Sequence, residues 1–252
     1  MSETSTEAFA GYRFHKVLGE GPDAGAFEAS EAESGDPVVI ESLVGAGADD
    51  PDVREWFTWA WATLADLEHP NLPEVRSIGR RGDVPFAVRE PIEGTRLPQA
   101  LAADGRIEPA DMRILICRMA DGLERAHEAG VIHGALGPED LILEPDSRTG
   151  ATGRWVGFGR VEGLRRDDVR GLGDVLWRLL EAERESREPG ADPVPGTATM
   201  DEAIIAMLTR VSEAAREGGL KTAGEFRDEV AAGTEPRRGW RRLTKFFGSA
   251  DA

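Results

Sequence analysis

The residues whose types and spacing are most suggestive of a reactive or binding site lie in one short segment of the chain, Val131 to Leu143, VIHGALGPEDLIL. Two apolar runs flank a tight polar loop, in which Gly134, Gly137 and Pro138 supply the backbone angles that a sharp reversal needs. Asp140 adds a carboxylate that could contact a metal ion. One carboxylate does not build a paired metal site, so the loop has the scaffold of a reactive site with little of its chemistry.

Cysteine and histidine are too few and too scattered to form a metal centre. The single Cys117 excludes an intrachain disulfide and a cysteine-based metal site, and its apolar helical surroundings predict a buried, inert thiol. The four histidines show no metal-ligand spacing. They are His15, His69, His127 and His133. We therefore expect neither a metal ion nor another cofactor.

The loop resembles the catalytic loop of the protein kinase family, whose signature HRDLKPEN is followed by an apolar strand. Aligned on His133, Leu136 and Pro138, the family's catalytic aspartate falls on Ala135 and its metal-binding asparagine falls on Asp140. The resemblance therefore implies a catalytic loop that keeps its shape and has lost its base.

Other signature segments of that family occur in the same order, with their charged residues changed. Residues 38–41, VVIE, resemble the strand motif VAIK, so the lysine that holds the phosphates falls on Glu41. Counting back nine residues from His69 puts the helical glutamate partner of that lysine at Ala60. VGFG stands where the family has DFG, which places the metal-binding aspartate at Gly157.

The segment PFAVREPIEGTRL resembles the hinge between the two lobes of a kinase. Arg89 then occupies the gatekeeper position, and Ile92 supplies the N–H that would meet adenine. Glu41 and Arg89 face each other in the family fold, so we expect a carboxylate–guanidinium pair where the phosphates and back pocket would lie. The alternative is that both side chains point to water past small neighbours such as Ala26.

The segment that follows Gly159 is short for a protein kinase. Only eight residues separate Gly159 from Asp168, and the motif APE that ends a kinase activation segment is missing. Asp168 matches the aspartate that steadies the catalytic-loop backbone in the family, so the resemblance implies that this structural role is kept. Little sequence remains beyond the Pro/Gly-rich residues 189–196 for the family's αG helix.

Hydrophobic periodicity and turn signals predict the elements that position these residues. Short strands are expected from Gly11 to Leu43, with a glycine-rich turn that contains Gly19 and Gly21. Further strands are expected over residues 75–78, 84–89, 141–144 and 154–156. Helices are expected over residues 52–67 with Asp52 as the N-terminal cap, 109–130, 167–183, 201–213 and 222–232.

These elements, together with the resemblance, predict an α+β protein with the bilobal protein kinase-like fold. It would have a small β-rich N-lobe and a mainly helical C-lobe, a shortened activation segment and a reduced or absent αG. The expected boundaries are a flexible leader at 1–10, the N-lobe at 11–92, the C-lobe at 93–234 and a basic amphipathic tail at 235–252.

Composition limits the partners and the location of the protein. The net charge of −17 argues against nucleic acid as a partner of the whole molecule. No run of 18 or more apolar residues occurs, so no transmembrane helix is expected, and the acidic N-terminus is unlike a signal peptide. We expect a cytoplasmic protein.

Two tryptophans flank Ala60 on the helix expected over residues 52–67. At 100° per residue, Trp59 and Trp61 lie on either side of Ala60, so the apolar arc spans roughly 200°, wider than one buried face requires. We expect both tryptophans to pack on the sheet and the neighbouring loop. The alternative is that one flank forms an exposed docking patch.

The last segment of the chain, PRRGWRRLTKFFGSADA, is basic and aromatic. Residues 236–252 carry +4, which leaves −21 for residues 1–235. We expect this tail to dock on the C-terminal lobe and to be releasable. The alternatives are docking on an acidic protein partner or weak contact with an anionic membrane surface. The candidate contact residues are Trp240, Arg241 and Phe246.

The changed residues point to a bacterial-type pseudokinase, which acts without catalysis as a scaffold or regulatory module for a protein partner. Phosphoryl transfer depends on Mg²⁺, a lysine and a positioned aspartate, and the resemblance implies that all three are lost. One alternative is a nucleotide-sensing pseudokinase that binds adenine at the hinge without metal. A further alternative is an enzyme that has reused the cleft for other chemistry.

Overall fold

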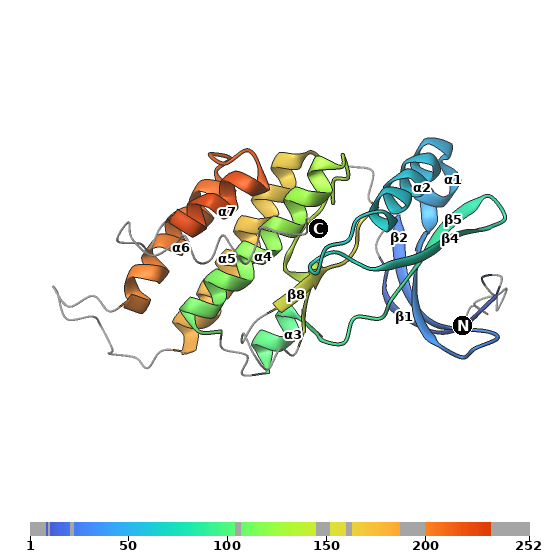
Figure 1. Cartoon of the computed structure of the whole chain (residues 1–252), viewed down its shortest axis with the longest axis horizontal. Helices are drawn as coiled ribbons and strands as arrows, with labels where there is room; N and C mark the ends of the chain where they lie inside the picture. Colours follow the sequence, from blue (N-terminus) through green and yellow to red (C-terminus); the bar gives the residue numbers. More distant parts are fainter. Residues whose placement is uncertain are drawn as a thin grey trace, which may run out of the picture.

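The computed structural model describes residues 9, 11–20, 23–103, 107–144, 152–159, 163–186 and 200–232. They form two parts, a β-sheet with two helices at the N-terminal side and a mainly helical part that follows it (Figure 1). Residues 90–94 connect the last strand of the sheet to the second part. The predicted α+β class, with a β-rich first part and a helical second part, is confirmed.

Five antiparallel strands build the first part, in the order β1-β2-β3-β5-β4. They are β1 (Tyr12–Glu20), β2 (Ala24–Glu31), β3 (Pro37–Leu43), β4 (Val75–Arg81) and β5 (Val84–Arg89). Gly35 and Gly82 have φ angles of +81° and +60° in the turns before β3 and β5, a conformation that glycine adopts without strain. β3 is the central strand, and every residue from Val38 to Leu43 is buried. Position 41 therefore lies in the interior.

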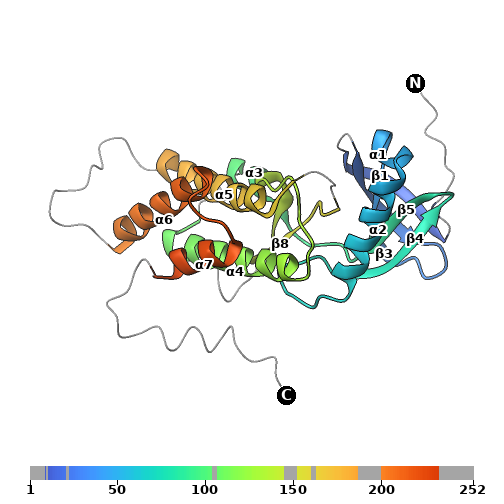
Figure 2. The same cartoon turned by 90° about the horizontal axis from the view of Figure 1, so that it is seen from above.

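Two helices, α1 (Gly45–Asp49) and α2 (Pro51–Ala65), pack on one face of the sheet (Figure 2). The predicted cap of α2 is wrong, because Asp50 rather than Asp52 caps the helix. The Asp50 carboxylate accepts hydrogen bonds from the N–H groups of Asp52 and Val53 at 2.9 and 3.4 Å. The short helix α1 was not predicted, because its five residues are too few to show a helical period.

One face of α2 packs into the main hydrophobic core. Its buried residues recur at positions i, i+3, i+4 and i+7, the spacing of a single helical stripe. They are Phe57, Ala60, Trp61 and Leu64. This face lies against β4 and β5. The burial of the stripe fixes α2 beside the strand that carries Arg89.

A small three-stranded sheet lies beneath the first part. It comprises β6 (Thr95–Arg96), β7 (Leu141–Glu144) and β8 (Thr152–Trp155), in that order. The Asn71 side-chain amide donates to the carbonyl of Gly153 at 2.7 Å, and the main-chain N–H of Trp155 donates to the main-chain carbonyl of Asn71 at 3.1 Å. These bonds tie the segment after α2 to the β7–β8 hairpin. The strands predicted over 141–144 and 154–156 are confirmed, although the second begins two residues earlier, at Thr152.

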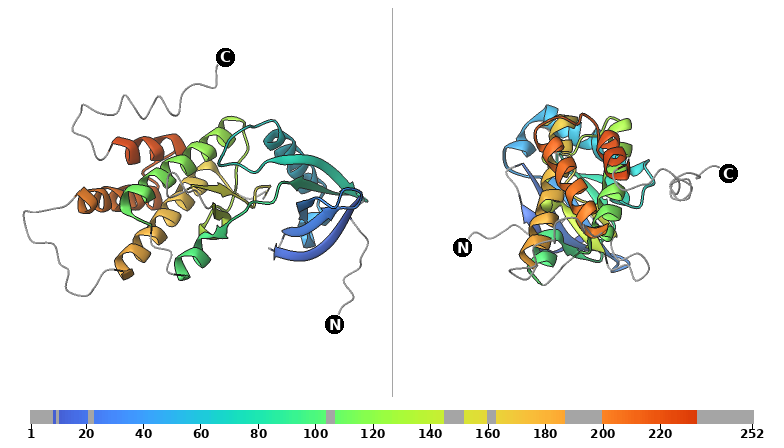
Figure 3. Two further views of the ribbon diagram at one scale, coloured as in Figure 1. Left: turned by 60° about the horizontal axis from the view of Figure 1, so that its bottom comes forward. Right: turned by 90° about the vertical axis from the view of Figure 1, so that its left-hand side faces the viewer.

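In the second part, α4 to α7 pack together as one bundle, whereas α3 lies against β6, β7 and the short turn at residues 138–140 (Figure 3). The helices are α3 (Leu97–Ala102), α4 (Pro109–Glu128), α5 (Arg165–Ser186), α6 (Met200–Arg216) and α7 (Ala223–Ala232). The predicted apolar face of α4 is buried, and Gly130, with φ +89°, follows the helix as expected. Thr222 caps α7 through its Oγ1, which accepts from the N–H of Glu225 at 3.0 Å. The helix expected over residues 222–232 therefore begins where the sequence predicted.

Two hydrophobic clusters lie inside the described part of the chain. The larger cluster runs through α2, α4, α5, α6 and α7, and the smaller one fills the other face of the sheet. Phe9, which lies in the segment expected to be a flexible leader, belongs to the smaller cluster, where its ring is 5.0 Å from that of Phe86. The rest of 1–10, the loop expected at 189–196 and the tail 235–252 lie outside the described residues. Among the described helices, none has the length and apolar character needed to cross a bilayer.

Candidate functional site

Glu41 and Arg89 form a buried ion pair between β3 and β5. Arg89 Nε lies 2.9 Å and Arg89 Nη2 lies 2.8 Å from Glu41 Oε1. The two side chains are 7% and 3% exposed, respectively. β3 and β5 are antiparallel neighbours with Val39 opposite Arg89, so Glu41 lies diagonally from Arg89 on the same face. The predicted pair is confirmed, and the alternative that both side chains reach water is wrong.

The remaining guanidinium nitrogen of Arg89 is also engaged. Its Nη1 donates to the main-chain carbonyl of Glu90 at 3.1 Å. A buried carboxylate and a buried guanidinium are each costly to leave unpaired, so the two charges hold each other in place. The pair leaves no net charge at this buried position between β3 and β5.

Asp168, at the start of α5, fixes the backbone of the loop that contains His133. Its carboxylate accepts hydrogen bonds from the main-chain N–H groups of His133 and Gly134, both at 2.8 Å. His127 Nε2 on α4 lies 2.8 Å from the same carboxylate, and both side chains are buried. The structural role expected for Asp168 is confirmed. The contribution of His127 was missed, although its place on the buried face of an amphipathic helix was a usable signal.

The loop is also tied to the segment that contains Gly157. His133 Nε2 lies 2.7 Å from the carbonyl of Val156, and its ring packs edge-on against Phe158 with centroids 4.9 Å apart. Asp140 lies in the short 3-10 turn η1 (Pro138–Asp140), is buried, and accepts the Gly137 N–H at 3.0 Å. These contacts hold the VGFG segment directly against the polar loop.

Asp140 and Gly157 are brought together by this arrangement. A Cβ atom at position 157 would lie 2.9 Å from Asp140 Oδ1, and Gly157 has φ +83°. A second carboxylate at position 157 would therefore face that of Asp140 at close range. In the described ranges of the chain, no group of three or more His, Cys, Asp or Glu side chains is arranged to hold a metal ion.

The two alanines that stand at catalytic positions of the resemblance lie in different surroundings. Ala135 is exposed on the loop, whereas Ala60 is fully buried on α2. Neither side chain can exchange a proton or bind a charge. The loop therefore presents a methyl group to solvent where the resemblance implies a catalytic carboxylate.

The segment after Gly159 crosses directly over the polar loop. α5 already begins at Arg165, and a Cβ atom at Gly163 would clash with the carbonyl oxygen of Gly134. Only a glycine permits this approach of two backbones. Residues 160–162 lie outside the described ranges.

Arg96 is a charged residue near the cleft that the sequence did not single out. Its Nη1 donates to the carbonyl of Glu139, and its Nη2 lies 3.7 Å from the position of a Cβ atom at Gly19. Arg96 thus places a cation between the expected glycine-rich turn and the turn η1. The residues around it are distant in sequence, so no local pattern revealed this contact.

The two tryptophans on α2 have different environments. Trp61 is fully buried, so its assignment to an interaction surface is wrong. The Gly159 backbone covers it, since a Cβ atom at position 159 would lie 2.7 Å from Trp61 Nε1. Trp59 is 42% exposed, so the expectation that both tryptophans are packed is wrong and one flank of α2 is open. Trp240, Arg241 and Phe246 lie outside the described residues.

Cys117 has no reactive character in the structure. It is partly buried on α4, with its Sγ 4.0 Å from the carbonyl of Arg227 on α7. Burial raises the pKa of its thiol to about 11, so the thiolate needed for nucleophilic or metal chemistry is scarce at neutral pH. This agrees with the inert thiol expected from the sequence.

Sequence comparison relates the chain to bacterial serine/threonine-protein kinases. Serine/threonine-protein kinase PkaB of Streptomyces coelicolor is 32% identical over 142 residues, which cover 56% of this chain and 34% of PkaB. Serine/threonine-protein kinase PknH of Mycobacterium tuberculosis is 23% identical over 182 residues, 71% of this chain and 28% of PknH. The chain thus spans about a third of the length of these relatives. No protein-family model matches the sequence.

Comparison with solved structures identifies the same fold. The kinase domain of Mycobacterium tuberculosis PknI, crystallised as a double mutant, superimposes with a TM-score of 0.66 and 18% identity. That match covers 93% of this chain and all of the crystallised domain. The PknI kinase domain without these mutations gives a TM-score of 0.64 over 91% of the chain.

Proposed function

Because this chain has the fold of the protein kinase-like superfamily, we propose that it is a pseudokinase, a member that transfers no phosphate and acts as a scaffold or regulatory binding module. One observation carries this proposal. The buried Glu41–Arg89 pair occupies the position where the resemblance implies the lysine that holds the phosphates.

The pair changes what the cleft wall can bind. A lysine in this place would present a free cation to a phosphate, whereas a neutralised pair attracts no anion. Arg89 does not replace the lysine, because its Nε and Nη2 contact Glu41 and its Nη1 donates to Glu90. Recruiting Arg89 to a phosphate would leave the Glu41 carboxylate unpaired and buried.

The other positions of the resemblance support the same conclusion. Gly157 supplies no metal ligand, and Asp140 on its own offers a single carboxylate that is already bonded to the Gly137 N–H. Ala135 cannot orient or deprotonate a substrate hydroxyl. Catalysis would therefore lack its phosphate cation, its paired metal ligands and its base at once.

A thermal-shift assay of the full chain with ATP or ADP, each with and without Mg²⁺, tests the proposal. We expect Mg²⁺ to add nothing to any nucleotide effect, because the paired metal ligands are missing. A melting temperature that rises only when ATP and Mg²⁺ are present together would contradict this. The matched control is Asp140→Asn, which should give the same nucleotide and metal response as the parent chain.

Arg96 favours a second candidate function, the sensing of an adenine nucleotide without metal. Its guanidinium lies between the turn at Gly19 and the carbonyl of Glu139, where it could meet a phosphate. In this case the same assay shows stabilisation by ATP or ADP that is independent of Mg²⁺. Arg96→Gln should then abolish it, whereas Arg80→Gln on the exposed β4 should leave it unchanged.

A further inference from the structure

An acidic and aromatic stripe runs along α2. Its four side chains recur at positions i, i+3, i+4 and i+7 of the helix and line a groove of about 320 Å³. They are Asp52, Glu55, Trp56 and Trp59. We call this set the α2 stripe. Asp52, Glu55 and Trp59 are exposed, whereas Trp56 is partly buried and packs against the edge of the main core.

Trp59 is the aromatic residue of the stripe that remains open to solvent. The Trp56 and Trp59 rings pack against each other with centroids 4.9 Å apart, and Trp59 is still 42% exposed. The outer edge of the Trp59 ring reaches the second part of the molecule, since a Cβ atom at Gly130 would lie 3.2 Å from it. Paired aromatic rings next to carboxylates form a surface suited to a basic, aromatic segment.

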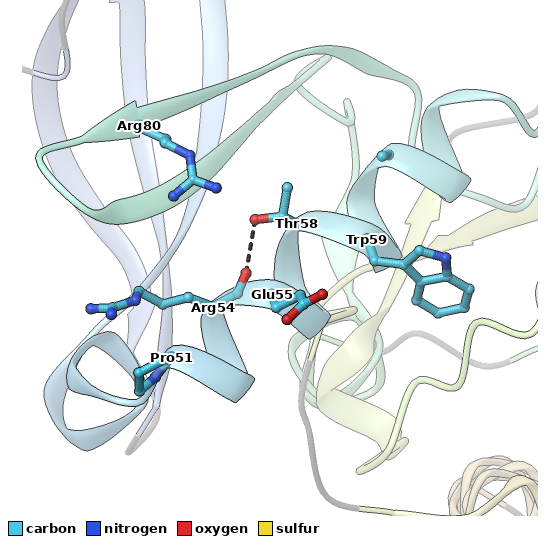
Figure 4. Close-up of a pocket in the computed structure, with 7 residues that line it drawn as sticks. Pro51, Arg54, Glu55, Thr58, Trp59 and Arg80 are labelled. Atoms are coloured by element: carbon cyan, nitrogen blue, oxygen red, sulfur yellow. Dashed lines mark hydrogen bonds between the residues drawn. The ribbon is translucent and has the colours of Figure 1, made fainter.

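A second hollow of about 540 Å³ continues beside the stripe (Figure 4). It is bounded by Arg54, Glu55, Thr58, Trp59 and Arg80, together with Pro51 and Ala62. Glu55 and Trp59 line both hollows, so the two form one continuous surface across α2. Such a surface accommodates a segment of several residues rather than one side chain.

We propose that the α2 stripe binds residues 236–252 of the same chain. This segment carries five basic residues and one Asp, with Trp240, Phe246 and Phe247 among them. Its guanidinium groups can pair with Asp52 and Glu55, and its cations and rings can pack on the two tryptophans. The charges of the stripe and the segment are thus opposite, and both surfaces are aromatic.

The length of the chain permits this contact. Gly224 on α7 bonds to Glu124 near the end of α4, and Arg227 lies next to Cys117, so α7 runs antiparallel to α4. The end of α7, residue 232, therefore lies level with about residue 112 of α4. At 1.5 Å per residue this is roughly 27 Å along the helix axis from Gly130, the residue that Trp59 approaches. The eight residues that lead from residue 232 to Trp240 span about 28 Å when extended. Residues beyond Trp240 extend this reach along the stripe.

Tethering favours this occupant over a free basic peptide, because a connected segment has a high effective concentration at a site within its reach. The contact differs from the sequence-based expectation, which placed the tail on the C-terminal lobe. It does not depend on whether the chain transfers phosphate. Binding of the tail would cover the open flank of α2 and expose it again on release.

Disulfide trapping in the full chain tests the contact. The test variant carries Cys117→Ser, which removes the native thiol, together with the two substitutions Glu55→Cys and Phe246→Cys. The control pairs Phe246→Cys with Glu33→Cys, an exposed site on the β2–β3 turn outside the stripe. We expect the Glu55 variant to form an intramolecular disulfide at least tenfold faster than the control, as quantified by mass spectrometry after non-reducing digestion.

Two further variants define the outcome. Trp59→Ala, or 0.5 M NaCl, should reduce the trapping rate of the Glu55 variant several-fold, because each removes one part of the proposed contact. Equal rates at Glu55 and Glu33, or disulfides that join only separate chains, would overturn the proposal. So would trapping that occurs only when anionic vesicles are present. Normal melting temperatures of all variants confirm that the comparison is made between folded proteins.

Discussion

Arg89 and Glu41 share an interior environment in which each charge depends on the other. Their side chains are 3% and 7% exposed, and two of the three guanidinium nitrogens contact the carboxylate. At a solvent-exposed site such an ion pair contributes little to the free energy of unfolding. In the protein interior, removing one partner leaves a buried unpaired charge, which strongly destabilises the folded state. The pair therefore constrains both the stability of the sheet and the chemistry of the cleft.

The first prediction is that Arg89→Met lowers the free energy of unfolding by about 3–5 kcal/mol, because it leaves the Glu41 carboxylate buried without a partner. The double variant Glu41→Leu with Arg89→Met should regain most of this loss, since no charge then remains in the interior. Urea denaturation of the four proteins of this cycle measures the effect.

Arg76 offers a matched control for that cycle. It pairs with Glu90 and Glu31 at the protein surface, where its side chain is 30% exposed. Arg76→Met should cost no more than about 1 kcal/mol. A cost for Arg89→Met as small as that for Arg76→Met would contradict the interior role of the pair.

The polar loop illustrates how one helix start organises several elements. Asp168 on α5 accepts from the main-chain N–H groups of His133 and Gly134 and contacts His127 on α4. We predict that Asp168→Ala lowers the free energy of unfolding by about 3–5 kcal/mol, because it leaves buried donors without an acceptor. Chemical denaturation checks this value.

Asp174 is the matched control on the same helix. Its carboxylate is half exposed and pairs with Arg216 at 2.9 Å. Asp174→Ala should therefore cost less than about 1 kcal/mol. If both alanine variants are equally stable, Asp168 does not hold the loop.

A second network links α4, α7 and the segment after α2. The pKa of the Asp121 carboxyl lies below its ordinary value, chiefly because of its hydrogen bond with His69. Burial raises this pKa, but the hydrogen bond and the positive charge of Arg227 lower it further. A lowered folded-state pKa means that the carboxylate contributes stability above its unfolded pKa, near 4. This contribution is lost as the pH falls through the folded pKa.

The third prediction follows from this sign. The free energy of unfolding of the parent chain should exceed that of Asp121→Asn near pH 5, and the difference should shrink below about pH 4. Denaturation at several pH values measures it. A difference that grows on acidification would contradict the assignment.

The sequence predicted elements with long periodic patterns better than short or contact-dependent features. The α4 face and the cap of α7 were recognisable because each follows a local rule. The helix α1 is too short to show a period, and Asp50 competes with Asp52 for the same capping role. Such choices are decided by the local backbone path.

The candidate site was predictable where the resemblance to the kinase family supplied the neighbours. Glu41 and Arg89 stand at positions that face each other in the family fold, so their pairing was expected, and the register of β3 and β5 confirms it. The exposure of Trp59 was not expected, because the helical period gives the width of an apolar arc and does not show which part of it the neighbouring elements cover. Arg96 was missed because its partners are far away in sequence.

At the scale of the whole molecule, the described residues have the fold of a kinase domain, and the proposed function rests on the charges that this fold carries. The hydrogen bonds of Asn71 with Gly153 and Trp155 tie the two parts together. Residues 1–235 carry a strong negative charge, and the last residues are basic. An acidic body of this kind repels nucleotide phosphates unless a local cation compensates, which suits a binding role better than ATP turnover.

Phosphate transfer by the intact chain is the measurement that tests this conclusion most directly. The chain is incubated with radiolabelled ATP, Mg²⁺ or Mn²⁺ and a generic protein substrate, and the label in both proteins is quantified. We predict no incorporation above that of a heat-denatured sample. Incorporation that is present in the parent chain and lost in Asp140→Asn or Glu41→Gln would contradict the proposal.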